Sequence, residues 1–157
     1  MQDILTCAMG LDVHRDIIVA CLVKGAVDAE PEAETRTFST LIPEMQKLRD
    51  WVIESECRNI AMESTGIYWQ PIYEMLESCF DGEISILVVN ARHMKNVPGR
   101  KTDMKDAQWI ATLLRAGLLK GSFIPDKAFR ELRHLTRYRK SVVHDITAQK
   151  NRIDKFL

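Results

Sequence analysis

The sequence predicts an α/β fold: a mixed five-stranded sheet with flanking helices, followed by a long C-terminal coiled-coil helix. Three observations predict it. Short apolar runs containing β-branched residues alternate with stretches of helical spacing over residues 1–122. Neither Gly nor Pro occurs from Lys127 to Leu157. The chain has 157 residues, the length of one ordinary domain, which can form a hydrophobic core without disulfides or metal.

The first part of the chain predicts a three-stranded meander. Residues 5–12 and 16–23 are apolar runs separated by three residues, which is typical of a β-hairpin. A loop rich in Ala, Glu and Pro follows, and then a third strand near Thr35–Phe38.

Two strand–helix units come next. Apolar residues at helical spacing predict an amphipathic helix over residues 42–55, with Pro43 in its first turn. A short strand from Asn59 to Met62 ends at Glu63, and residues 68–79 have a second helical pattern. These units extend the meander into a larger sheet.

The most apolar strand is expected at Ile84–Val89, whose composition is typical of a sheet covered on both faces. A loop from Asn90 to Thr102 precedes a helix predicted from Asp103 to Leu119, with a stop near Gly121. The order β-β-β-α-β-α-β-α fits one mixed sheet with helices on both faces, the ribonuclease H type of architecture.

The C-terminal segment, residues 126–157, predicts a coiled-coil helix separate from the domain at residues 1–122. Polar Arg139 and Gln149 interrupt its heptad seam, and such residues commonly set register or oligomer state. The helix lacks a stop signal before the chain ends, so we expect a fragment truncated within it. The seam consists of Ala128, Leu132, Leu135, Arg139, Val142, Ile146, Gln149, Ile153 and Phe156.

Several protein classes are excluded by composition. No apolar run approaches the roughly 20 residues of a membrane span, and the N-terminus lacks the pattern of a signal peptide. We therefore expect a cytoplasmic protein without a membrane partner. The cysteines form no C-x-x-C pair and lie in apolar or helical contexts, which favours reduced, buried thiols over disulfides or zinc. They are Cys7, Cys21, Cys57 and Cys79.

The net charge of zero conceals an asymmetry between the two halves. Residues 1–89 carry 6 Lys and Arg against 16 Asp and Glu, whereas residues 90–157 carry 16 against 6. A basic second half indicates a polyanion partner.

Four acidic residues fall at the ends of three predicted elements. Asp12 ends the first strand, Glu63 follows the fourth, and Asp103 and Asp106 lie three apart in the first turn of a helix, on one face. They can converge at one edge of the sheet. The simpler alternative is that Asp103 is an N-cap and that the helix dipole stabilises Asp106.

Clustered carboxylates repel each other unless a cation lies among them. Oxygen ligands suit Mg²⁺ or Mn²⁺, and two ions about 3.5–4 Å apart would serve an in-line phosphoryl displacement. Basic residues beside the aspartates are expected to bind the phosphate backbone, although solvated surface charge is the ordinary alternative. These residues are Arg92, Lys95, Arg100, Lys101 and Lys105.

Three segments carry a resemblance to a known family. "GLDVHRD" with Asp12, "MESTGIYW" with Glu63, and "GRKTDMKDAQWIATLLRAGLL" with Asp103 and Asp106 resemble the N-terminal RuvC-like domain of the DEDD transposases, bacterial insertion-sequence recombinases related to the Piv invertases. The resemblance covers almost the whole chain.

The resemblance implies a four-acid site that binds divalent metal for DNA strand cleavage and transfer. It also implies a coiled-coil segment through which copies associate, and a structured guide RNA that selects the target. A further C-terminal domain with a nucleophilic serine would follow the end of this chain, so the fragment by itself is not expected to complete recombination.

Residues beside the acids have two interpretations each. His14 is either a metal neighbour or proton carrier, or has a turn or supporting role, which is the interpretation we favour. Ser64 and Thr65 either orient Glu63 or cap the next helix. Tyr68 and Trp69 either stack on a base or pack against the sheet, and packing is the simpler interpretation.

Two other functions remain open. Gly10, Leu11 and Asp12 before a hairpin also resemble the phosphate loop of the actin and sugar-kinase fold, an ATPase; His14 replaces the glycine expected there. The second is a non-enzymatic oligomerisation or nucleic-acid-binding module, in which the acids act as caps and ion-pair partners. In that case Arg130, Arg133, Arg137 and Lys140 of the last helix bind nucleic acid or form a polar coiled-coil face.

Overall fold

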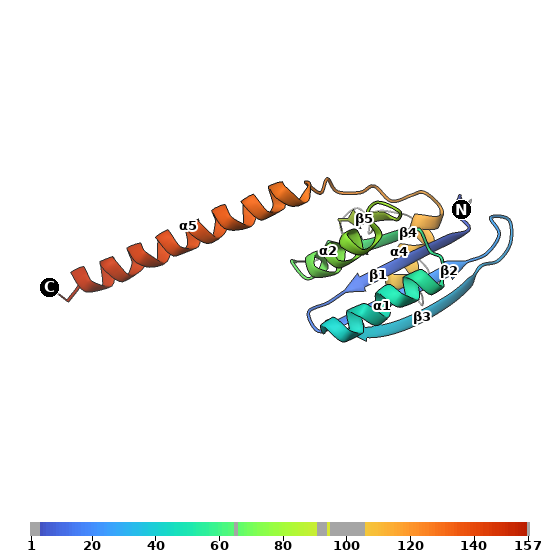
Figure 1. Ribbon diagram of the computed structural model, residues 1–157, viewed down its shortest axis with the longest axis horizontal. Coiled ribbons are helices and arrows are strands. Elements are labelled where there is room, and N and C mark those ends of the chain that lie inside the picture. The colour runs from blue at the N-terminus through green and yellow to red at the C-terminus, as the bar shows by residue number, and fades with distance from the viewer. Residues whose placement is uncertain (1–3, 65, 91–93, 95–105, 157) are drawn as a thin grey trace. The chain divides into compact units, whose positions relative to one another are not determined.

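The computed structural model describes residues 4–64, 66–90, 94 and 106–156. Contacts between residues divide the chain into two compact units, Met1–Ser122 and Phe123–Leu157. The first unit contains a sheet and its helices, and the second contains one long helix (Figure 1). Within the described residues no helix has both the length and the apolar character needed to cross a membrane.

Most elements begin and end within two residues of the predicted bounds. Between Val89 and Asp106 only residues 90 and 94 are described, so the predicted loop and the start of the helix at Asp103 lie outside the described residues. In chain order the elements are β1 (Cys7–Val13), β2 (Ile17–Lys24), β3 (Glu32–Ser39), α1 (Ile42–Glu54), β4 (Asn59–Glu63), α2 (Trp69–Phe80), β5 (Ser85–Val89), α4 (Asp106–Arg115) and α5 (Lys127–Asp154).

The five strands form one mixed sheet in the order β3-β2-β1-β4-β5. β1, β2 and β3 pair antiparallel as a meander, and β1 pairs parallel with β4, which in turn pairs parallel with β5. This topology confirms the predicted mixed sheet. It also places the carboxyl ends of β1, β4 and β5 at the same edge, where ligand sites of open α/β sheets commonly form.

Helices cover both faces of the sheet. Figure 1 shows α1 and α2 on one face and α4 on the other. On the first face, Trp51 of α1 packs near Phe38 of β3, with ring centroids 6.1 Å apart. Successive residues of a strand face opposite sides of the sheet. Met9 and Leu11 of β1 are fully buried on the side of α1 and α2, and Ala8 and Gly10 lie on the side of α4.

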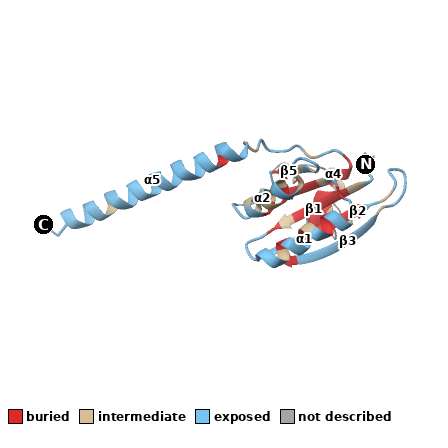
Figure 2. Cartoon of the chain, in the orientation of Figure 1, coloured by how far each residue is buried: buried red, intermediate tan, exposed pale blue. Residues whose placement is uncertain are grey.

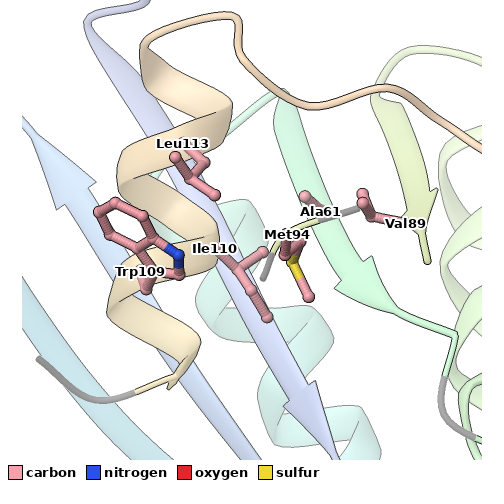
Figure 3. Close-up of a cluster of buried hydrophobic side chains, with 6 residues drawn as sticks. All are labelled: Ala61, Val89, Met94, Trp109, Ile110 and Leu113. Atoms are coloured by element: carbon pink, nitrogen blue, oxygen red, sulfur yellow. The ribbon is translucent and has the colours of Figure 1, made fainter. Parts of the chain in front are cut away.

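The core on the α4 face brings together residues that are far apart in sequence. Figure 3 shows Trp109, Ile110 and Leu113 of α4 beside Ala61 of β4 and Val89 of β5, with Met94 completing the cluster. A second cluster joins Ala107 and Ala111 to Cys21 and Val23 of β2. Burial of these side chains holds α4 against the sheet, whose buried residues are red in Figure 2.

The expectation for β5 is confirmed at the end of the strand but not at its start. Val88 and Val89 face opposite sides of the sheet and are both buried, whereas Ser85 is exposed and Ile86 and Leu87 are half-buried. β5 is the last strand of the sheet, so only one of its sides pairs with another strand along its length. An isolated bridge between Val89 and Gly121 covers part of the open side.

The predicted end of α4 is wrong. The helix ends at Arg115 rather than at Leu119, because Gly117 adopts a left-handed conformation with φ of 68°. Its N–H donates to Leu114 O at 3.0 Å, and the N–H of Leu118 donates to Leu113 O at 3.0 Å. This pair of bonds is a Schellman motif, which Gly favours because it has no Cβ.

Arg115 fixes that end of α4. Its side chain is buried and donates from Nε to Leu5 O at 2.9 Å and from Nη2 to the carbonyls of Gly25 and Ala26. The carbonyl of Arg115 in turn accepts from the backbone N–H groups of Ile4 and Leu5. One residue therefore ties the helix to the start of β1 and to the loop after β2.

The four cysteines are free thiols, as expected, but their burial differs. Cys21 and Cys57 are buried and Cys7 is half-buried, whereas Cys79 is exposed in the last turn of α2, so the prediction of burial is wrong there. An amphipathic helix buries only one face, and the buried residues of α2 are Ile72 and Leu76.

The second unit consists of α5 and the segment before it. Asp126 caps the helix by accepting from the N–H of Phe129 at 3.0 Å. Arg130 is buried and donates from Nη1 to Pro125 O at 2.7 Å, so it stabilises the start of α5. Beyond Arg130, most of α5 is pale blue in Figure 2, which means exposed. The exposed residues include the apolar heptad residues Leu132, Leu135, Val142, Ile146 and Ile153.

Candidate active site

Asp12 and Glu63 lie side by side at the carboxyl ends of two neighbouring parallel strands. The register pairs Leu11 of β1 with Met62 of β4, so the next positions on the two strands are Asp12 and Glu63. Neighbouring strands are about 4.8 Å apart. The backbone thus places these two carboxylates at one edge of the sheet.

Both residues are on the face that α4 covers. A Cβ built on Gly10 would meet backbone atoms of α4, and Asp12 is two residues further along the same strand. Ala61 packs in the cluster with Ile110, and Glu63 is again two residues further along. The alternation of side chains therefore directs both carboxylates toward the helix.

Asp106 reaches the same edge from the helix. It is the first described residue of α4, and the next residue, Ala107, lies against Gly10 of β1. Three predicted acids from β1, β4 and α4 are consequently brought together. Asp103 lies outside the described residues, so its position is not part of this geometry.

The electrostatics of Asp12 reflect this arrangement. Burial raises the pKa of the Asp12 carboxyl above its ordinary value, and the charge of His14 opposes the shift. The negative charges of Asp106 and Glu63 raise the pKa further. Asp12 is therefore close enough to Asp106 and to Glu63 to be repelled by both, which is an energetic cost in the protein without a cation.

His14 is the nearest polar partner of Asp12. Its Nε2 lies 3.0 Å from Oδ2 of Asp12, and its backbone N–H donates to Ile17 O at 2.9 Å in the hairpin turn. The Asp12 side chain is 16% exposed and that of His14 is 55% exposed. His14 thus combines a place in the turn with a direct contact to the acid, where it can orient the carboxylate and, when protonated, offset its charge.

The donor set fits a hard divalent cation in type. Carboxylate oxygens are the ligands that Mg²⁺ and Mn²⁺ prefer, and a cation would offset the repulsion that raises the pKa of Asp12. As placed, the described residues contain no group of three or more His, Cys, Asp or Glu side chains that could hold a metal ion. A complete site would need a small closure of these groups, or Asp103, or both.

The predicted phosphate-binding residues cannot be placed. Arg92, Lys95, Arg100, Lys101 and Lys105 all lie outside the described residues, and so does Thr65.

Other predicted neighbours of the acids are described. The N–H of Ser64 donates to Val89 O at 2.8 Å, which extends the β4–β5 pairing just past Glu63. Trp69 is half-buried and packs edge-on to Tyr73, with centroids 5.7 Å apart, whereas Tyr68 is exposed.

One feature of the site escapes prediction from motifs. The close contact between Gly10 and α4 decides how near Asp106 comes to Asp12, yet Gly10 suggests only a phosphate loop when the sequence is considered alone. The available signal is a Gly two residues before an acid on a buried strand, because Gly in a strand often marks close approach of another backbone.

The sheet topology and the acids at its carboxyl edge define a domain of the ribonuclease H-like, RuvC-like class. Among solved structures, RuvC of Thermus thermophilus matches with a TM-score of 0.51 at 12% identity, over 74% of this chain and 99% of that chain. The T. thermophilus RuvC structure in complex with a Holliday junction substrate gives 0.51 at 12% identity, over 75% and 100%. These likenesses confirm the predicted fold.

The family follows from the sequence. The profile of the IS110-type DEDD transposases, described as "Transposase", matches residues 9–157, so the chain belongs to that family. A comparison with curated proteins found no match. Family and fold together confirm the predicted resemblance to the DEDD transposases and the RuvC-like fold of the domain.

Proposed function

We propose that this domain cleaves and transfers DNA strands at a divalent-metal site formed by Asp12, Glu63, Asp103 and Asp106. The observation that carries the proposal is the convergence of carboxylates from β1, β4 and α4, where burial and then the charges of Asp106 and Glu63 raise the pKa of Asp12. Such a cluster is costly for stability alone, and clusters of this kind are typical of metal-dependent phosphoryl transfer. We assign the catalytic domain to residues 1–122.

Each acid has a distinct place in the proposed site. Asp12, on the middle strand of the sheet, would be the anchoring ligand, held by His14 at 3.0 Å. Glu63 would bind from the neighbouring strand, and Asp103 and Asp106 from the helix. Two Mg²⁺ or Mn²⁺ ions bound there would supply Lewis-acid stabilisation of the attacking and leaving oxygens.

DNA is the proposed substrate. Support comes from the transposase family and from T. thermophilus RuvC, which is known in complex with a Holliday junction substrate. Residues 90–157 carry ten more basic than acidic residues, so a polyanion would be attracted to this half of the chain. We propose that Arg92, Lys95, Arg100, Lys101 and Lys105 bind phosphates next to the acids.

We further propose that residues 126–157 form a coiled coil through which copies of the chain associate. Leu132, Leu135, Val142 and Ile146 recur at heptad spacing and are 37–66% exposed on α5. An apolar stripe of this length on one helix favours a second helix as its partner. A structured guide RNA is proposed as a further partner of the basic half, on the strength of the family resemblance.

The first test is Mn²⁺ binding by calorimetry. Wild-type protein would be compared with Asp12→Asn, Asp103→Asn and Asp106→Asn, with circular dichroism to show that each variant is folded. Asp28→Asn, which changes an exposed acid in the loop between β2 and β3, is the matched control. We expect the three site variants to lose binding and the control to retain it. Equal binding by all variants would contradict the proposed ligands.

A further inference from the structure

β1 and α4 approach each other closely at Gly10. A Cβ at this position would overlap the backbone oxygen of Ala107, lie 2.5 Å from the backbone nitrogen of Ala111 and lie 3.0 Å from Cβ of Ile110. The first two are helix backbone atoms, so no side-chain rotation can make room. Any residue other than Gly therefore requires the strand and the helix to separate.

The facing surface of the helix is also built for close approach. Ala107 and Ala111 are the α4 residues opposite Gly10, both are almost completely buried, and both pack with Cys21 of β2, the cross-strand partner of Gly10. Small residues on both elements shorten the distance between a strand and a helix. The gap is thus set by Gly10 on one side and by two alanines on the other.

This contact lies between two of the proposed ligands. Asp12 is two residues after Gly10 on β1, and Asp106 directly precedes Ala107 on α4. We infer that Gly10 is a positioning residue, whose missing side chain sets the distance between the carboxylates of Asp12 and Asp106. The inference rests on the proposed function, because it matters only if those two carboxylates bind one metal centre.

The expected displacement is large on the scale of a metal site. Carbon atoms in ordinary contact are about 3.5–4.0 Å apart, so the turn that contains Ala107 and Ala111 must retreat by roughly 1.5 Å to accommodate a methyl group. Ligand positions in functional sites must be held within about 0.5 Å. Loss of support around metal ligands typically weakens affinity by about 10- to 100-fold, and we expect a loss in this range for Gly10→Ala.

The test combines a structure with a binding measurement. Crystal structures of wild-type protein and Gly10→Ala would show whether α4 moves away from β1 at Ala107. Mn²⁺ calorimetry on the same proteins gives the change in affinity. Gly25→Ala is the matched control, because its new Cβ would lie 3.0 Å from a backbone carbon, Cα of Pro31, in the loop after β2 and away from the acids. We expect the control to retain wild-type affinity.

Rescue by a longer carboxylate separates positioning from a merely structural role. Asp106→Glu adds one C–C bond of about 1.5 Å, which is comparable to the expected shift of the helix. In the Gly10→Ala background this change should recover part of the Mn²⁺ affinity, whereas in wild-type protein it should weaken binding. Loss of general stability at Gly10 would produce no such reversal.

If Gly10→Ala does not fold, Ala111→Val provides the same test from the helix side, because Ala111 faces β2 and is fully buried. An unmoved helix, or unchanged Mn²⁺ affinity in a folded variant with a displaced helix, would overturn the inference while leaving the proposed metal site intact. Absence of Mn²⁺ binding by wild-type protein would overturn the proposed metal site itself, and the role of Gly10 with it.

Discussion

Truncation of Arg115 to Ala should strongly destabilise the first unit. The side chain is 1% exposed and joins the last turn of α4 to two other segments. Its hydrogen bonds run to Leu5 O at 2.9 Å, Gly25 O at 3.1 Å and Ala26 O at 2.5 Å. Arg115→Ala removes all three donors and leaves the carbonyls to whatever water can enter the vacated space.

The size of the effect follows from these bonds. A hydrogen bond from a charged group contributes about 1.5–3 kcal/mol net. Removing the guanidinium also removes the cost of burying its charge, which is on the order of several kcal/mol. The net loss of stability is therefore smaller than the sum of the three hydrogen-bond contributions. We expect the free energy of unfolding to fall by about 3–4 kcal/mol. This is a large fraction of the roughly 5–15 kcal/mol that stabilises an ordinary domain.

Urea unfolding followed by tryptophan fluorescence measures this change. The three tryptophans, Trp51, Trp69 and Trp109, all belong to the unit Met1–Ser122, so the signal reports on that unit alone. Arg15→Ala is the control, because the Arg15 side chain is 79% exposed and its loss should cost about 0.5 kcal/mol or less. A loss below about 1 kcal/mol for Arg115→Ala would refute the anchoring role.

Three further predictions concern other parts of the chain. A hydrogen bond with Cys57 lowers the pKa of Cys7 to about 7, so alkylation of Cys7 by iodoacetamide should rise through neutral pH. Cys57→Ala should move that rise to higher pH, and site-resolved mass spectrometry would show an unchanged profile if the interpretation is wrong. On α5, Leu135→Glu should reduce self-association in analytical ultracentrifugation, whereas Ser141→Glu, outside the seam, should not; equal behaviour would contradict the coiled coil. At the end of α4, Gly117→Ala should cost about 1–2 kcal/mol in urea unfolding and Gly117→Asn less, because Asn tolerates positive φ; equal losses would argue against backbone strain.

Local sequence patterns predict most of this fold because each element carries its own periodicity and breakers. Pro43 marks the first turn of α1, and the alternating apolar runs indicate both strands of the hairpin. The predictions that failed concern features that are determined by contacts between distant parts of the chain. An apolar run such as Ser85–Val89 does not reveal whether its strand is central or at an edge, since strand order is set by the whole chain. Gly117 and Gly121 are equally plausible helix stops until the bonds of the last turn are known.

The sequence predicts at which ends of the elements the candidate acids lie, but not how close together they come. Acids at predicted strand and helix ends identify Asp12, Glu63 and Asp106, because α/β topology brings such ends to one edge. Their separation depends on how closely α4 approaches β1, which involves contacts such as that of Gly10 with Ala107. No local pattern contains that information, since the two residues are distant in the chain.

The two ends of α4 explain how the domain can hold carboxylates together against their repulsion. At the carboxyl end, the buried Arg115 ties the helix to the start of β1, and the burial of Ile110 and Leu113 holds its middle against β4. At the amino end, Gly10 allows close approach and so leaves Asp106 next to Asp12. The repulsion between Asp12 and Asp106, which adds to the effect of burial in raising the pKa of Asp12, acts at the amino end, whereas the stabilising contacts extend along the helix. A cation that offsets this repulsion would therefore bind beside a helix that is already held in place along its length.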